Sequence, residues 1–133
     1  MRRIGHFING QLVPGDGARL GDVFDPATGQ VQTRVALASA DEVSAAVAAA
    51  QAAFPAWAAT PPLARARILF RYKALLEEHA GELAAAITAE HGKVLADARG
   101  EVTRGIEVVE FACGAPHLLK GEHSMDVGRD VDS

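Results

Sequence analysis

Arg104 is the residue whose type and surroundings most clearly suggest binding chemistry. It lies in the stretch EVTRGIEVVEFACG, whose valine and isoleucine spacing predicts a helix, yet Gly100 and Gly105 lie close to it on either side. A glycine inside a helix costs about 1 kcal/mol relative to alanine. A planar guanidinium beside cleared space is suited to binding a carboxylate through paired hydrogen bonds. The pattern therefore suggests that Arg104 binds an organic acid.

The phase of this helix leaves a second interpretation of Arg104 open. The apolar side of the helix comprises Leu95, Val102, Ile106, Val109 and Cys113. At about 100° per residue, Arg104 points almost directly away from that side. A solvated arginine with Glu101 and Glu107 as helix-spaced ion partners would fit this position. Against it, Val108 and Phe111 lie on the arginine's own side, so we expect this part of the helix to be buried on both faces in its complete context.

Other reactive residue types have simpler structural explanations. Cys113 falls on the apolar side with no histidine at a suggestive spacing, so we predict a buried structural cysteine. His91 precedes Gly92 at a helix end, where a cation suits the helix dipole as well as it suits acid–base chemistry. The histidines and the cysteine show no metal-ligand spacing, and no phosphate-binding glycine motif occurs. Phe54 and Trp57 are expected to pack in the core.

Length and composition limit the chain to one domain or part of one. It has 133 residues, of which 49% are hydrophobic, and a formal net charge of −4. That charge gives no electrostatic footprint for nucleic acid. No apolar run reaches the length of a signal sequence or a membrane span. We therefore expect a cytoplasmic protein with no nucleic-acid or membrane partner and no bound metal.

The first part of the chain, about residues 4–38, predicts short β-hairpins. Asn9-Gly10 between apolar residues favours a type I′ turn. A second turn, built on Asp25-Pro26, separates two further β-prone stretches. These features predict a small N-terminal antiparallel sheet.

The next part, about residues 40–119, predicts about four α-helices. Ser39 and Glu42 form a capping box for the first helix, which we expect to end near Pro55. Thr60, followed by proline, is expected to cap the second helix.

The remaining helices follow similar signals. The third is predicted to end at Gly92, and the fourth to run from about Leu95 toward Pro116. Residues 120–133 are polar and show no cap or closing strand. The chain as given is therefore predicted to be α+β, with a small sheet followed by helices.

Several sequence stretches resemble a known enzyme family. FINGQLV, FDPATGQV and AEHGKVLADARGEV are similar to the N-terminal quarter of the aldehyde dehydrogenase superfamily. RARILFRYKALLEEH and RGIEVVEFACGAPHLLKGE resemble one branch, the CoA-acylating methylmalonate-semialdehyde (malonate-semialdehyde) dehydrogenases. The resemblance extends from Ile4 to Ser133. Asp25 replaces the asparagine usual before the Pro-Ala-Thr-Gly turn, which still allows an Asx-type turn.

The resemblance implies a specific chemistry for the full protein, which would have an α/β aldehyde dehydrogenase-like fold. Enzymes of this branch attack a semialdehyde with a cysteine thiolate and pass hydride to NAD. They then release CO₂ and transfer propionyl or acetyl to coenzyme A, as in valine catabolism. An arginine matching Arg104 is understood to hold the substrate carboxylate. The resemblance also implies a homotetramer.

The same resemblance implies what the 133 residues lack. The family's catalytic cysteine and most of its NAD-binding region match positions beyond Ser133, and residues 120–133 match the start of a hairpin used in subunit assembly. We therefore expect the chain alone to bind no cofactor and to have no dehydrogenase activity. The alternatives are a non-catalytic helical interaction module and another NAD(P)-dependent aldehyde dehydrogenase.

Overall fold

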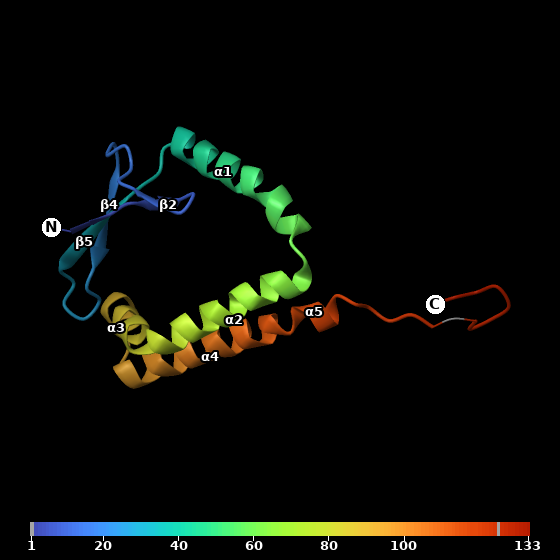
Figure 1. Cartoon of the computed structure of the whole chain (residues 1–133). Helices are drawn as coiled ribbons and strands as arrows, with labels where there is room; N and C mark the ends of the chain where they lie inside the picture. The colour runs from blue at the N-terminus through green and yellow to red at the C-terminus, as the bar shows by residue number, and fades with distance from the viewer. Residues whose placement is uncertain (1, 125) are drawn as a thin grey trace.

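The computed structural model describes residues 2–124 and 126–133, which form a β region followed by helices (Figure 1). The strands are β1 (Arg2–Ile4), β2 (His6–Ile8), β3 (Gln11–Val13), β4 (Leu20–Phe24) and β5 (Val31–Ala36). The helices are α1 (Ala40–Ala59), α2 (Pro62–Glu78), α3 (Ala80–His91), α4 (Leu95–Cys113) and α5 (Ala115–Leu118). This mixed content confirms the predicted fold class.

The first hairpin joins β2 and β3 around the predicted turn. Its strands pair antiparallel, with His6 opposite Val13. Asn9 has φ 52° and Gly10 has φ 74°. Both central residues thus adopt the positive φ that a type I′ turn requires, which confirms the prediction.

The second turn joins β4 and β5, which also pair antiparallel. The Asp25 carboxylate accepts a hydrogen bond from the Ala27 N–H at 2.8 Å, and the Asp25 carbonyl accepts one from Gly29 at 2.7 Å. Aspartate therefore makes the Asx-type turn that asparagine would make.

One feature of the predicted antiparallel sheet is wrong. β1 pairs with β5 in parallel, so the three-stranded sheet, in the order β1-β5-β4, is mixed, and β2–β3 form a separate two-stranded sheet. Tight turns impose antiparallel pairing only on the strands that they join. A long stretch containing three other strands connects β1 to β5, so turn signals could not fix their relative direction.

The capping box at the start of α1 forms as predicted, but the end of the helix does not. α1 continues through Pro55 to Ala59, because proline inside a helix removes a hydrogen bond without always ending the helix. Thr60 does not cap α2, whose N-cap is Pro61. The Thr60 hydroxyl instead donates to the Ala56 carbonyl at 2.9 Å, and Thr60 belongs to the end of α1.

α1 lies apart from the other long helices, as Figure 1 shows. It has no buried residue. Phe54 is 66% exposed and Trp57 is 45% exposed, so the expectation that they pack in a core is wrong within the described chain. The reason is tertiary: a helix buries an apolar face only where another element covers it.

α4 packs against both α2 and α3 through small side chains. The buried residues at these contacts are Ala66, Ala84, Ala98 and Cys113. Gly92 ends α3 with φ 81°, as predicted. The predicted fourth helix is divided at Gly114, and Pro116 lies in the short α5 instead of ending α4.

The segment after α5 extends away from the helices (Figure 1). Ser124 and Ser133 exchange backbone hydrogen bonds at 2.7 and 2.9 Å, which closes a hairpin-like loop. Residue 125, within the predicted assembly segment 120–133, lies outside the described residues. The role of this segment in subunit assembly stays a prediction.

No single helix in the described ranges combines the length and the hydrophobicity needed to cross a bilayer. α1 and α2 meet that criterion only when taken together, and they are bent by 116° at their junction.

Candidate functional site

Arg104 lies on the exposed side of α4, facing away from the helices that α4 packs against. On the opposite side Cys113 is only 6% exposed, and Val102, Ile106 and Val109 are half-buried. This arrangement confirms the predicted helix phase. It also confirms that Cys113 is a buried cysteine.

The guanidinium of Arg104 lies over Gly100, one turn earlier in α4. A Cβ placed on Gly100 would be 3.7 Å from Nη1 of Arg104. The same construction at Gly105 meets nothing within 4 Å. Of the two glycines, only Gly100 lies beneath the arginine.

The acidic neighbour at helical spacing does not pair with Arg104. Glu101 instead accepts a hydrogen bond from Nζ of Lys93, which precedes α4. This bond lowers the pKa of Glu101, against the opposing effect of desolvation, and the charge of Arg104 adds only a smaller contribution. No ion pair within the described ranges involves Arg104 or Glu107.

Lys93 is the residue near the site that sequence reasoning missed. It is eight positions from Glu101 and lies outside the helix, so no helical spacing rule relates the two residues. Only the turn between α3 and α4 brings them together. By binding Glu101, Lys93 leaves the guanidinium available to another anion.

Two large apolar side chains are exposed on the side of α4 that carries Arg104, together with the acidic Asp97 and Glu107. Val108 is 68% exposed and Phe111 is 71% exposed, which matches their predicted position on the arginine's side of α4. A cation beside exposed apolar side chains is suited to an organic acid with a short hydrocarbon part. A hollow lined by Ala80, Gly81, Arg99, Val102, Thr103 and Ile106 lies on another flank of α4 and does not include Arg104.

His91 is exposed at the end of α3. In residues 2–124 and 126–133, no three side chains of His, Cys, Asp or Glu lie close enough together to hold a metal ion. Among the predicted candidates, Arg104 alone is exposed and lies over a glycine, Gly100, that leaves the helix surface open.

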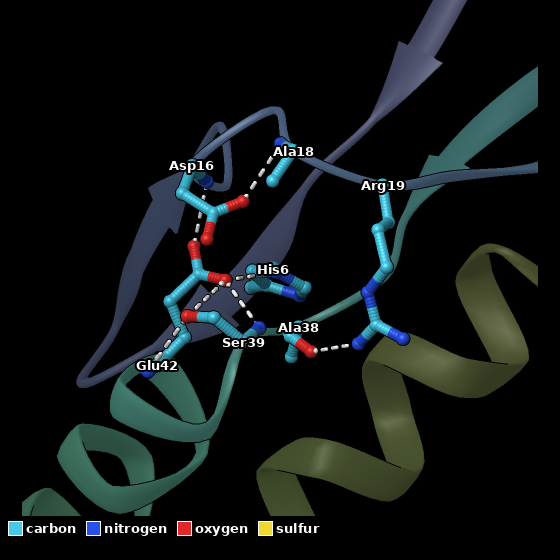
Figure 2. A network of polar contacts seen from close by, with 7 residues as sticks. All are labelled: His6, Asp16, Ala18, Arg19, Ala38, Ser39 and Glu42. Atoms are coloured by element: carbon cyan, nitrogen blue, oxygen red, sulfur yellow. Dashed lines mark hydrogen bonds and ion pairs between the residues drawn. The ribbon is translucent and has the colours of Figure 1, made fainter.

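A second polar cluster, shown in Figure 2, joins the β region to α1. Glu42 accepts hydrogen bonds from the backbone N–H of Ser39 at 2.9 Å and of Asp16 at 2.8 Å. The Ser39 hydroxyl accepts one from the Glu42 N–H at 3.3 Å, and His6 Nε2 lies 3.7 Å from the Glu42 carboxylate. The Ser39 N–H is the main cause that lowers the pKa of Glu42. These contacts are internal, so the cluster has a structural role.

The sequence from residue 12 to residue 132 matches the aldehyde dehydrogenase family. This chain belongs to that family. It is 49% identical over its whole length to malonate-semialdehyde dehydrogenase of Pseudomonas aeruginosa. It is 51% identical, over 96% of its length, to malonate-semialdehyde dehydrogenase 3 of Geobacillus kaustophilus. The chain spans about a quarter of these relatives, 27% and 26% respectively.

Solved structures of the aldehyde dehydrogenase family show the same arrangement. Methylmalonate-semialdehyde dehydrogenase of Oceanimonas doudoroffii is 57% identical, with a TM-score of 0.91 over 99% of this chain and 27% of its own. A protein of Sinorhizobium meliloti, described as a methylmalonate-semialdehyde dehydrogenase complexed with NAD, is 47% identical. Its TM-score is 0.90, with the same coverage. Both the family and the branch suggested by the sequence motifs are confirmed as resemblances.

The described residues do not fit an NAD site by themselves. Dinucleotides bind where a glycine-rich turn joins a parallel strand to a helix. In the described ranges a helix directly follows a strand only at β5–α1, and residues 37–39 between them contain no glycine. Within these ranges, no strand–turn–helix unit therefore has the glycine-rich turn that such a dinucleotide site uses.

Proposed function

We propose that this chain is the N-terminal part of a CoA-acylating methylmalonate-semialdehyde or malonate-semialdehyde dehydrogenase. The complete enzyme would convert the semialdehyde, NAD and CoA to propionyl-CoA or acetyl-CoA, CO₂ and NADH. The identities of 49% and 57% to proteins with these names support the proposal. Coenzyme A as acyl acceptor, a cytoplasmic location, a homotetramer and a place in valine catabolism belong to the same proposal.

Within this enzyme, Arg104 would bind the carboxylate of the substrate. The observation that carries this assignment is an exposed guanidinium that forms no ion pair with another described residue and lies over Gly100. A guanidinium presents N–H groups in a fork that matches the two oxygens of a carboxylate. Lys93 supports this role by binding the acidic neighbour that would otherwise compete.

Such an arginine would orient the substrate and select it. A semialdehyde of this class has a carboxylate at one end and the reacting aldehyde at the other. Fixing the carboxylate at Arg104 limits the positions that the aldehyde can occupy, and orientation of this kind accelerates a reaction without direct chemistry. Cys113 is buried, so the nucleophile would be another cysteine of the complete enzyme, and NAD would accept the hydride.

The test is a comparison of two substrates in the full-length enzyme. Arg104→Ala should lower kcat/KM for methylmalonate semialdehyde roughly thirty- to thousandfold, since a charge-assisted contact to the substrate is lost. Propanal resembles this substrate but lacks the carboxylate, so its poor turnover should barely change. Equal losses for both aldehydes, or no loss for either, would show that Arg104 is a solvated surface residue.

A further inference from the structure

We propose that Gly100 is a positioning residue for Arg104. Its missing side chain lets the guanidinium lie low along α4, where it can receive the substrate carboxylate. This inference rests on the proposed role of Arg104 and adds a second residue to the acid-binding site.

No backbone requirement explains a glycine at position 100. Gly92 needs to be glycine because it ends α3 with φ 81°. Gly100 lies inside α4 and is not among the residues with positive φ. There a glycine weakens the helix by about 1 kcal/mol relative to alanine. The backbone therefore tolerates a side chain at position 100, and the effect of a larger one depends on what surrounds it.

The surroundings of Gly100 identify one neighbour. Among the described residues, apart from the two chain neighbours and the helix backbone, the only atom within 4 Å of a Cβ placed there is Nη1 of Arg104, at 3.7 Å. That distance is ordinary van der Waals contact, so alanine would fit. A longer side chain would extend from Cβ into the volume of the guanidinium and displace it from the helix surface.

Gly105 provides a matched control within the same helix. It is also an internal glycine of α4, but a Cβ placed on it meets nothing within 4 Å. A new side chain at Gly105 would raise helix propensity to the same degree as one at Gly100. The two positions therefore differ in contact with Arg104 and not in backbone conformation.

The experiment compares Gly100→Leu with Gly105→Leu in the full-length enzyme, with Gly100→Ala as the conservative variant. Gly100→Leu should raise KM for methylmalonate semialdehyde about tenfold, with a smaller change in kcat, because the displaced guanidinium binds the carboxylate less well. Gly100→Ala and Gly105→Leu should stay within about threefold of the parent. Propanal kinetics should be unchanged in all three variants.

A double-mutant cycle tests whether Gly100 acts through Arg104. In an Arg104→Ala background, Gly100→Leu should cause no further loss with the acid substrate. A full additional loss in that background, or equal effects of Gly100→Leu and Gly105→Leu, would overturn the proposal. If Gly100→Leu does not fold, Gly100→Met replaces it, because its unbranched side chain reaches the same volume.

The outcomes also separate this inference from the proposed function. A selective loss in Arg104→Ala with no effect of Gly100→Leu overturns only the role of Gly100. No selective loss in Arg104→Ala overturns both proposals, because Gly100 then has no acid-binding group to position.

Discussion

Glu42 and Arg104 are charged side chains on two different helices, and they differ in the use of their polar atoms. Glu42 accepts hydrogen bonds from two backbone N–H groups and lies beside His6 (Figure 2). Arg104 is exposed, and no ion pair between described residues includes it. Both residues therefore carry charge, but the charge of Glu42 is used within the fold.

The comparison suggests how to distinguish a structural charge from a ligand-binding charge. Glu42 joins the loop at Asp16 to the first turn of α1, so its contacts hold the β region against a helix. Near Arg104 the fold does the opposite: Lys93 binds Glu101, and Gly100 leaves the surface open. A charge that forms no ion pair within the described part of the fold is suited to a ligand from outside.

The strongest test of this difference asks whether carboxylate binding needs the planar guanidinium of Arg104 or only its positive charge. Arg104→Lys retains the charge but removes the planar fork, so kcat/KM for methylmalonate semialdehyde should fall about tenfold or more. Steady-state kinetics of the full-length enzyme, with propanal as the control aldehyde, would measure this. Full activity in Arg104→Lys would mean that a point charge is sufficient and that bidentate binding is wrong.

The exposed apolar side chains on the Arg104 side of α4 give the next largest expected effect. The 133-residue chain should bind a hydrophobic dye or self-associate, because Val108 and Phe111 are exposed together on α4. Val108→Ser with Phe111→Ser should reduce dye fluorescence relative to the parent chain. A monodisperse chain with sharp, cooperative unfolding and no dye binding would favour an independent helical module.

In the Glu42 cluster, a smaller loss of stability is expected. Ser39→Ala removes the hydroxyl that accepts from the Glu42 N–H, and loss of such an N-cap costs about 1 kcal/mol. Urea denaturation of the chain would measure it. Catalytic specificity should not change in the full-length enzyme, and a change in the ratio between the two aldehydes would contradict the structural role of the cluster.

The same cluster should respond to acid. Hydrogen bonds from the Ser39 N–H, and from the Ala18 N–H to Asp16, lower the pKa of Glu42 and of Asp16 respectively. A depressed carboxyl pKa stabilises the fold above the unfolded value and loses this effect as pH falls through the folded value. Amide hydrogen exchange at the start of α1 should therefore accelerate below about pH 4.5, after correction for intrinsic rates. Glu42→Gln should flatten the pH dependence of this exchange. An unchanged pH dependence in the variant would mean that the Glu42 carboxylate does not stabilise the start of α1.

The smallest expected effect concerns Lys93. Lys93→Met should free Glu101 to approach Arg104, three positions later in α4, and so compete with the substrate carboxylate. Exposed ion pairs are weak, so KM for the acid substrate should rise only about twofold. The double variant Lys93→Met with Glu101→Gln should restore the parent KM. No restoration would mean that Lys93 acts in another way.

Local signals in the sequence predicted the parts of this chain that depend on neighbouring residues. The Asn9-Gly10 turn, the capping box at Ser39 and the left-handed Gly92 all formed as expected, because each depends on the backbone preferences of a few adjacent residues. The predicted end of α1 was wrong because a single proline does not decide where a helix ends. Thr60 was misassigned because its hydroxyl could either accept a hydrogen bond from an amide at the start of α2 or donate one to a carbonyl at the end of α1. It donates to the Ala56 carbonyl.

The sequence by itself determined most of the elements, the helix phase that exposes Arg104, and the resemblance to the aldehyde dehydrogenase family. It did not determine the end of α1 or the division of the last helix at Gly114. Only the tertiary structure decided the parallel pairing of β1 with β5, the exposure of Trp57, and the binding of Glu101 by Lys93. The physical reason is the same in each case. Whether two elements meet, or a side chain stays uncovered, depends on residues that no turn or helical repeat relates. Helix phase already places Gly100 on the side of Arg104, and the structure adds only the direction that the arginine side chain takes over it.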